Sequence, residues 1–293
     1  MRKLGFIFAG QGQQFSYMGQ DLIETFPQAK ARYEQANALL NLDVVTLNLE
    51  STHHTQVALF VLEAVIDDLL KAHEVIPSVV CGLSLGEYGA LYSSGAISFE
   101  DGLKIIDKRG ALMDAAFEKG ETKMAACVRT NRETVARLIQ ALDVEICNVN
   151  TPSQIVIGGK SSDVDAAIVH LKENKVRAIP LKVATVSHMS LLKEQSDALK
   201  TYLETFTFNK PTIPFINNLH AAFQEDNFPE TLARQISETT ELCASIELML
   251  DQGVTEIIEV GPKGAISKFV KEINPDIPVY NIYDVETLKE IIA

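Results

Sequence analysis

The hydrophobic residues of this chain fall into two patterns, which alternate along most of its length. Short, fully apolar runs are typical of strands buried on both faces of a parallel sheet, and apolar residues three and four positions apart are typical of helices that pack on it. The runs predict strands at residues 4–8, 77–81, 212–216, 256–260 and 278–283. The spaced pattern predicts helices at residues 20–40, 55–73, 86–94, 98–117, 191–206 and 231–236, a helix ending at Gly253, and a helix after residues 261–264. Strands alternating with helices predict a parallel α/β core.

The segment 121–187 has a different pattern. It predicts, in order, a strand at 124–128, a helix at 131–141, strands at 144–150 and 154–159, a helix at 162–173 and a strand at 177–183. The order β-α-β-β-α-β is that of a ferredoxin-like unit. We therefore predict a ferredoxin-like small subdomain at residues 121–187, inserted into a core formed by residues 1–120 and 188–293.

The apolar run that ends at Cys81 leads into Gly-Leu-Ser-Leu-Gly at residues 82–86, followed by a predicted helix. Gly-x-Ser-x-Gly between a strand and a helix is the pattern of a nucleophile elbow, in which a sharp, strained turn exposes the serine hydroxyl. The backbone amide of Leu85 would then point to the place where an oxyanion forms. The bare pattern also occurs by chance in loops, but the flanking elements supply the required context. Ser84 is therefore a candidate nucleophile, and the core is predicted to be α/β-hydrolase-like.

Composition narrows the class of protein. The chain has 293 residues, 46% of them hydrophobic, which is enough for a sizeable core. Its 26 basic and 39 acidic residues give a net charge of -13, which argues against nucleic acid or an anionic membrane as the main partner. No apolar run is long enough to span a bilayer. The first run resembles that of a signal peptide, but it stops at Gln11 with no small-residue cleavage site after it, so a buried strand is favoured. The four cysteines are far apart, which is typical of thiols in a reducing compartment. We therefore expect a cytoplasmic protein without a metal.

A serine hydroxyl becomes a good nucleophile only when a base takes its proton. Among the six histidines, the pair at His53 and His54 falls in a segment predicted to be irregular, and adjacent residues point to different sides, so an exposed loop is favoured over a metal site. His188 differs, because it lies in a polar run where the chain re-enters the core. The residues alone leave its role as the base open.

A hydrolase triad also needs an acidic residue that orients the histidine, placed between the serine and the histidine in the chain. The sequence offers Asp101, Asp107 and Asp114, and nothing selects one of them. This gap counts against an ordinary esterase.

A larger set of motifs is spread over the whole chain. It comprises Gly-Gln-Gly-Gln-Gln at residues 10–14, Thr55-Gln56, the elbow at 82–88, Lys108-Arg109-Gly110, Met124-Ala125-Ala126, Asn-Val-Asn-Thr-Pro at 148–152, His188, Gln235 and Glu-Val-Gly-Pro at 259–262. In this order and at this spacing, the set resembles the malonyl-CoA:acyl carrier protein transacylases of bacterial type II fatty acid synthesis.

The resemblance implies a reaction and two reacting side chains. Ser84 would take the malonyl group from malonyl-CoA and pass it to the phosphopantetheine thiol of an acyl carrier protein, in fatty acid biosynthesis. His188 would be its general base and acid. Malonyl-CoA is then a substrate and no cofactor is implied. We also expect a monomer.

The resemblance further implies how the acyl group is held. The backbone amides of Gln11 and Leu85 would form the oxyanion hole, and Arg109 would pair with the free malonyl carboxylate. A planar guanidinium can hold a carboxylate by two parallel hydrogen bonds, although a solvated helix arginine is the usual alternative. Gln235 would lie beside His188, where in this family a main-chain carbonyl accepts the second imidazole proton. That carbonyl would replace the triad acid.

Some positions depart from the family pattern. Leu83 stands where histidine is frequent, residues 185–188 replace a Gly-Pro-Phe-His run, and residues 239–242 replace a Pro-Val-x-Trp-like run. These departures leave the acyl selectivity open, together with a specialised polyketide or lipid pathway that uses the same chemistry. A serine esterase or thioesterase is a further alternative, against which Arg109 and Gln235 argue, because a simple esterase needs neither.

The carrier protein needs a place to dock. Carrier proteins of this kind are typically acidic, so a local basic patch must attract them to an acidic enzyme. The best candidate is a cluster of cations on the last predicted helix and strand of the small subdomain, shortly before His188, namely Lys172, Lys175, Arg177 and Lys182. A solvated face is an equally good interpretation of this cluster. We take Lys175 and Arg177 as its centre.

Overall fold

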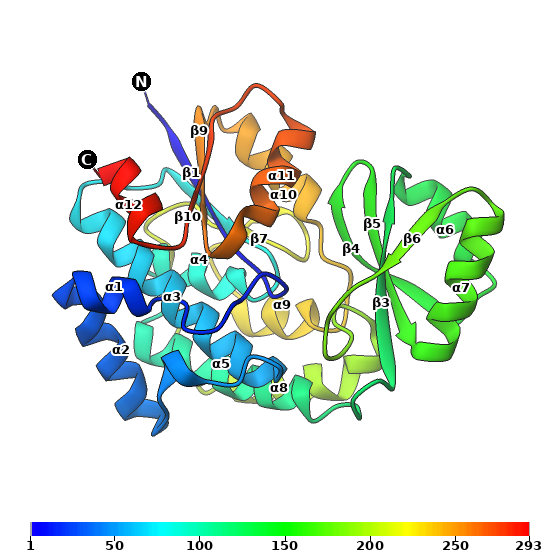
Figure 1. Cartoon of the computed structure of the whole chain (residues 1–293), viewed down its shortest axis with the longest axis horizontal. Coiled ribbons are helices and arrows are strands. Elements are labelled where there is room, and N and C mark those ends of the chain that lie inside the picture. Colours follow the sequence, from blue (N-terminus) through cyan, green and yellow to red (C-terminus); the bar gives the residue numbers. More distant parts are fainter. Residues whose placement is uncertain (1, 293) are drawn as a thin grey trace.

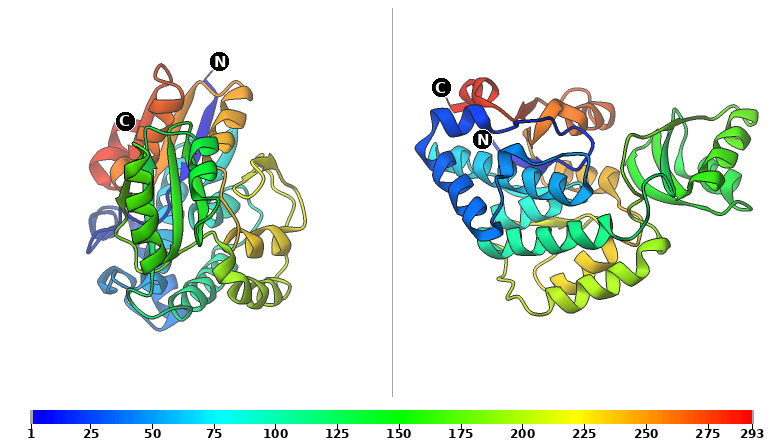
Figure 2. Two further views of the ribbon diagram at one scale, coloured as in Figure 1. Left: turned by 90° about the vertical axis from the view of Figure 1, so that its right-hand side faces the viewer. Right: turned by 60° about the horizontal axis from the view of Figure 1, so that its bottom comes forward.

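The computed structural model describes residues 2–292 and has a larger and a smaller part (Figure 1). The smaller part, drawn in green, projects from one end of the larger part, as the right-hand view of Figure 2 shows. The amino- and carboxyl-terminal ends of the chain both lie on the larger part, so the chain leaves it and returns to it. Among residues 2–292, no helix combines the length and the apolar character needed to cross a bilayer.

A parallel four-stranded sheet forms the centre of the larger part. Its order is β10-β9-β1-β2, and all three pairings are parallel. The strands are β1 (Leu4–Phe8), β2 (Val79–Gly82), β9 (Glu256–Val260) and β10 (Val279–Ile282). Every residue of β1 is buried, as its continuous apolar run predicts. Phe8 pairs with both Gly82 and Val260, so the carboxyl ends of three strands meet at one edge of the sheet. The predicted parallel α/β core is confirmed.

Helices cover both faces of this sheet. On one face, Ile7, Cys81 and Ile257 pack against α10 (Leu242–Asp251) and α11 (Ala265–Ile273). On the other, Phe6 and Phe8 pack against a thicker layer. That layer contains α1 (Gln20–Thr25), α2 (Pro27–Leu40), α3 (Thr52–Ala72), α4 (Gly86–Ser93), α5 (Phe99–Asp114), α8 (Lys193–Leu203), α9 (Phe228–Gln235) and α12 (Val285–Ile292).

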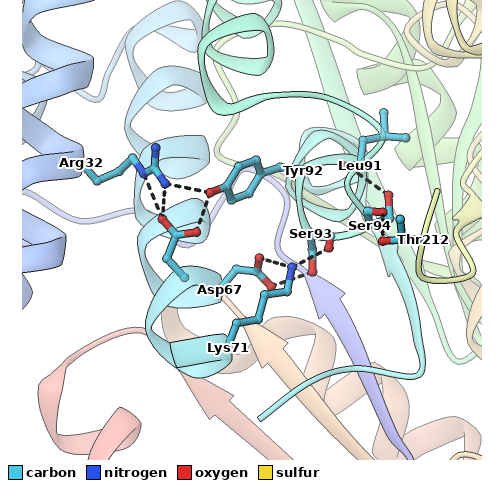
Figure 3. Close-up of polar contacts among 9 residues, drawn as sticks. Arg32, Asp67, Lys71, Leu91, Tyr92, Ser93, Ser94 and Thr212 are labelled. Atoms are coloured by element: carbon cyan, nitrogen blue, oxygen red, sulfur yellow. Dashed lines mark hydrogen bonds and ion pairs between the residues drawn. The ribbon is translucent and has the colours of Figure 1, made fainter. Parts of the chain in front are cut away.

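Polar contacts fasten α2, α3 and α4 to one another (Figure 3). The guanidinium of Arg32 on α2 donates to Asp68 on α3 at 2.6 Å and to the hydroxyl of Tyr92 on α4 at 3.0 Å. Ser93 at the end of α4 donates to the buried carboxylate of Asp67 at 2.6 Å. These bonds anchor the carboxyl end of α4, whose amino end follows Ser84.

The smaller part is an antiparallel sheet with two helices. It contains β3 (Thr122–Val128), α6 (Arg132–Ile139), β4 (Val144–Thr151), β5 (Gln154–Lys160), α7 (Ser161–Glu173) and β6 (Arg177–Pro180). The strand order β4-β5-β3-β6 is that of a ferredoxin-like unit, so this prediction is confirmed. One face packs on α6 and α7, and the other packs through Met124 and Val156 on Val186 and Met189 of the returning chain.

A segment of the larger part extends the small sheet. The backbone amide of Thr240 donates to Cys147 of β4 at 2.9 Å, and its carbonyl accepts from Val149 at 2.9 Å. The side chain of Asn148 donates to the Thr240 hydroxyl at 2.7 Å. Residues 239–240 therefore lie along the outer edge of β4, so the two parts are joined by hydrogen bonds as well as by chain crossings.

Two predictions about helix bounds were wrong. The single helix expected at residues 20–40 is two helices that meet at Phe26, which is extended because Pro27 disfavours helical geometry in the residue before it. The helix expected from residue 55 begins at Thr52. His53 and His54 therefore lie in its first turn and not in an irregular loop.

The strand expected at residues 212–216 was also wrong. Only β7 (Ile216–Asn217) forms there, paired antiparallel with β8 (Ala222–Phe223), while Phe215 makes a single bridge to Val80 of the parallel sheet. Pro214 lacks an N–H group and cannot donate to a strand ladder, which interrupts the run.

Candidate active site

Ser84 lies on a tight turn between β2 and α4. Its φ is 56°, in the left-handed region that costs a non-glycine residue energy. A Cβ atom on Gly82 would lie 2.1 Å from the carbonyl carbon of Gly86, and a Cβ on Gly86 would lie 2.1 Å from the carbonyl oxygen of Phe8. Both positions therefore require glycine, and the turn packs directly on the carboxyl end of β1.

An imidazole stands beside the serine hydroxyl. Nε2 of His188 is 2.8 Å from Oγ of Ser84, and Nδ1 is 2.6 Å from the main-chain carbonyl oxygen of Gln235. A carbonyl oxygen only accepts, so Nδ1 carries the proton and Nε2 is left to accept from the serine. His188 has a φ of 63°, and its amide donates to Ile236 at 2.8 Å, which fixes the ring further.

The surroundings keep this imidazole neutral. Burial lowers the pKa of His188 to about 3 from its usual value, the hydrogen bond to Gln235 opposes this, and the charge of Arg109 adds to the lowering. At neutral pH the ring therefore carries one proton and can accept another from Ser84.

The three aspartates considered as triad acids all bond elsewhere. Asp101 accepts from Ser98, Asp107 contacts His53, and Asp114 accepts from Ser51. The main-chain carbonyl of Gln235 occupies the place that an acid would take beside His188.

A buried guanidinium faces the same hydroxyl. Nη2 of Arg109, on α5, donates to Oγ of Ser84 at 3.1 Å and to Oε1 of Gln235 at 3.1 Å, while Nη1 donates to Oε1 of Gln56 at 2.6 Å. Arg109 is fully buried, and burial lowers its pKa. Its Nε atom has no hydrogen-bond partner within residues 2–292. An acyl group on Ser84 with a terminal carboxylate would place that carboxylate within reach of this cation.

The loop after β1 lies against the serine turn. A Cβ on Gly10 would be 2.9 Å from the carbonyl oxygen of Leu83. The side chain of Gln11 accepts from Gln56 at 3.0 Å, which ties the loop to α3. The loop that contains Gln11 is thus packed against the serine turn, which continues into Leu85.

Comparison with known proteins identifies the family. Residues 5–273 match the family model of the acyl transferase domain. Over 304 aligned residues the chain is 33% identical to the malonyl CoA-acyl carrier protein transacylase of Bacillus subtilis, with 99% of this chain and 96% of that protein covered. The chain belongs to the malonyl CoA-acyl carrier protein transacylase family.

Two further members of the family are similarly close. The polyketide biosynthesis malonyl CoA-acyl carrier protein transacylase PksC of Bacillus subtilis is 33% identical over 285 residues, covering 92% of this chain and 97% of that protein. The crystal structure of the Clostridium perfringens transacylase superposes with a TM-score of 0.94 at 35% identity, covering 98% of this chain and 95% of that one.

Three polar residues at the site were given no role by the sequence. Gln56 and Glu87 belong to motifs of the transacylase family, and this membership could have pointed to them. Asn218 follows β7, and no sequence motif marked it. Its Oδ1 accepts from the backbone amide of Ser84 at 2.9 Å.

The cations predicted to dock a carrier belong to the smaller part, whereas Ser84 belongs to the larger part. Lys175 and Arg177 are exposed, at the turn from α7 into β6 of the small sheet. In the β3–β6 register, Arg177 pairs with Val128 and Ile179 pairs with Ala126. Paired residues share a face, so both lie on the face of the sheet that is directed toward the larger part.

Proposed function

We propose that this chain transfers the malonyl group from malonyl-CoA to the phosphopantetheine thiol of an acyl carrier protein, through a malonyl ester on Ser84, in fatty acid biosynthesis. One observation supports this most directly. The Ser84 hydroxyl lies within hydrogen-bond distance of a neutral imidazole on one side and a buried guanidinium on the other. A base and a carboxylate partner at one nucleophile suit an acyl donor that is itself a carboxylic acid.

In the first half-reaction, Nε2 of His188 takes the Ser84 proton while Oγ attacks the thioester carbonyl. The amides of Gln11 and Leu85 stabilise the oxyanion. The C–S bond then breaks and the imidazolium returns the proton to the departing CoA thiol. In the second half-reaction the carrier thiol loses its proton to His188 and attacks the ester, and Ser84 leaves with that proton.

Arg109 selects the acyl group. When malonyl occupies Ser84, the guanidinium exchanges its bond to the serine oxygen for two bonds to the malonyl carboxylate. In a buried site such a charged pair is weakly screened, so it discriminates strongly against an acetyl group, which has no charge. Both steps move an acyl group between oxygen and sulfur, so the proposal includes no metal or organic cofactor.

Carrier docking is proposed at the exposed cations Lys175 and Arg177. Two partly exposed apolar side chains follow these cations along the chain toward His188, namely Ile179, which is 38% exposed, and Leu181, which is 36% exposed. Together the cations and these apolar residues form a strip on the surface. A mixed cationic and apolar strip suits an acidic partner with an apolar stripe.

We further propose a cytoplasmic monomer. The side chains proposed to bind and react all come from one chain. The four cysteines, Cys81, Cys127, Cys147 and Cys243, are buried free thiols, which fits a reducing compartment.

A second candidate is the same transfer in a polyketide pathway, which the similarity to the Bacillus subtilis polyketide transacylase favours. The two candidates differ in the carrier protein and share the chemistry of Ser84. Transfer to a fatty acid carrier and to polyketide carriers, measured side by side, separates them.

The intact mass of the protein after mixing with malonyl-CoA, acetyl-CoA or methylmalonyl-CoA tests the proposal. Malonyl-CoA should add one malonyl mass to the wild type and none to Ser84→Ala. The adduct should persist until a thiol is added. An adduct on another residue, or rapid release of free malonate as an esterase would give, contradicts the proposal.

A further inference from the structure

A buried acid lies directly behind the site and has no part in the mechanism above. Glu87 is in the first turn of α4 and is 2% exposed. Its Oε1 accepts from the backbone amide of Asn218 at 2.7 Å, and its Oε2 accepts from Nε2 of Gln235 at 2.5 Å. We propose that Glu87 is the positioning residue that fixes the side-chain amide of Gln235 and, through it, the guanidinium of Arg109. This inference rests on the proposed role of Arg109.

The amide of Gln235 could in principle sit in either of two orientations. In the structure its Nε2 donates to Glu87 and, at 2.8 Å, to the carbonyl oxygen of Ser84, while its Oε1 accepts from Arg109. The reversed amide would set its oxygen against two acceptors and its NH₂ group against a guanidinium, which only donates. The carboxylate of Glu87 therefore helps to select the orientation that presents an acceptor to Arg109.

Electrostatics favours the same arrangement. Arg109 is fully buried, and within residues 2–292 its hydrogen-bond partners are two amide oxygens and a hydroxyl, with no carboxylate among them. Glu87 is the acid that faces it through the Gln235 amide. Burial raises the pKa of Glu87 to about 7, whereas its hydrogen bonds to Asn218 and Gln235 and the charge of Arg109 act in the opposite direction. Near neutral pH Glu87 is therefore partly ionised, and the two N–H groups that it accepts from favour its ionised form.

Glu87 also reaches the nucleophile by a second path. It holds the backbone amide of Asn218, and the side chain of Asn218 accepts from the backbone amide of Ser84 at 2.9 Å. The carboxylate is therefore linked to the serine turn through Asn218 on one side and Gln235 on the other.

The substitution Glu87→Gln distinguishes a role of Glu87 in orienting the Gln235 amide from a role in merely filling space. Glu87 accepts hydrogen bonds on two oxygens, and glutamine has one oxygen and one NH₂ group of nearly the same shape. That NH₂ group would meet either the Asn218 amide or the Nε2 of Gln235, both donors. Relief by rotating the Gln235 amide would remove the acceptor from Arg109.

The experiment measures the rates at which malonyl-CoA and acetyl-CoA load Ser84. In Glu87→Gln we expect the malonyl:acetyl ratio to fall by at least ~10-fold and acetyl loading to change by less than ~3-fold, because an acceptor to a charged group is lost. The matched control is Glu259→Gln. Glu259 is also fully buried and accepts from two backbone amides, Ile266 at 3.1 Å and Ser267 at 2.7 Å, but at the start of α11. Its variant should keep the wild-type ratio.

A double-mutant cycle tests whether Glu87 acts through Gln235. Gln235→Leu removes the side-chain amide and keeps the main-chain carbonyl that holds His188. We expect the double variant to have the malonyl:acetyl ratio of Gln235→Leu to within about 2-fold, because residues that act in one chain of contacts are not additive. The ratio is used because the contact through Asn218 affects the serine turn, and so affects both acyl groups alike. A wild-type ratio in Glu87→Gln, or losses that multiply in the double variant, overturns the inference.

Two outcomes are kept distinct. If the wild type takes no malonyl group on Ser84, the proposed function fails. If the wild type is loaded and the Glu87 variant keeps its ratio, only this inference fails. Should Glu87→Gln not fold, Gln235→Leu alone decides, since an unchanged malonyl:acetyl ratio in that variant overturns the inference.

Discussion

The imidazole of His188 is held by the main-chain carbonyl of Gln235, 2.6 Å from Nδ1, and not by a carboxylate. A carbonyl orients the ring and fixes its tautomer, but it brings no full negative charge to stabilise an imidazolium. The hydrogen bond to this carbonyl thus only partly offsets the lowering of the pKa by burial, and the pKa of His188 stays well below its ordinary value. A base of this kind suits an enzyme whose ester intermediate must wait for a thiol.

Arg109→Ala should reduce loading of malonyl on Ser84 by about 2–5 kcal/mol of transition-state stabilisation, because the malonyl carboxylate would be buried without its partner. Acetyl loading should fall less, or rise. The measurement is the loading rate for each acyl-CoA, with Arg132→Ala as the control, since Arg132 is an arginine outside the site that pairs with Glu241. Equal losses for the two acyl groups would assign Arg109 a structural role.

The pKa of His188 makes a prediction about stability. Its value is about 3 in the folded chain and about 6.5 when unfolded, so between these pH values only the unfolded chain binds the proton. The contribution of His188 to the free energy of unfolding should therefore rise with pH over this window, by about 1.4 kcal/mol per unit, and level off above it.

Urea unfolding of the wild type and of His188→Asn from pH 4 to 8 gives this contribution as a difference. Taking the difference cancels the buried carboxyls whose raised pKa values act in the opposite direction, such as that of Glu87. Asparagine is chosen because it tolerates the left-handed φ of position 188. A difference that does not change between pH 4 and 6.5 would show that the folded imidazole titrates normally.

Gly86→Ala should destabilise the protein by about 1–3 kcal/mol and abolish most loading, because the added methyl group meets the backbone of Phe8 at 2.1 Å. The added atom separates the serine turn from the loop that carries the Gln11 amide. Gly159→Ala on β5 is the matched control, since its nearest neighbour would be 3.1 Å away. Thermal unfolding and the loading rate are measured for both. A Gly86 variant that loads like the wild type would exclude this close approach.

Reversing Lys175 and Arg177 to glutamate should slow transfer to the carrier protein and leave loading by malonyl-CoA unchanged. The wild-type transfer step should also slow as salt is raised, because the attraction is between exposed charges. Lys30 and Lys210, exposed on the larger part, serve as a control pair for the same change of charge. If the reversed enzyme transfers at the wild-type rate in low salt, the docking site lies elsewhere, and Lys263, Lys268 and Lys271 become the next candidates.

Much of the fold could be predicted from local sequence patterns. The apolar runs of β1 and β9 and the strand–turn–helix around Ser84 could be read from residues that are neighbours in the chain. The predicted helix at residues 20–40 is interrupted at Pro27, and the predicted strand at residues 212–216 does not form before Pro214. In each case a single missing or crowded backbone group outweighed the surrounding hydrophobic pattern.

The site was less accessible to such patterns. Asn218 lies 134 residues from Ser84 in the chain, and it reaches the serine only because β7 lies beside the parallel sheet. Its surroundings in the sequence, a short hairpin, carry no sign of this contact. Glu87 lies in the elbow motif, but its two partners come from distant segments, so its role depends on tertiary contacts that no local periodicity encodes.

The hydrogen bonds between β4 and Thr240 bear on how members of this family can be recombined. Exchanging residues 121–187 alone between two transacylases would cut the chain at its two crossings but leave the outer edge of β4 facing a foreign segment. A chimera should therefore exchange residues 239–241 together with the insert, because these residues join the two parts by hydrogen bonds in addition to the two chain crossings. Gln235, whose carbonyl holds His188, lies only four residues before this segment, so a mismatched graft would misplace the base as well as the sheet.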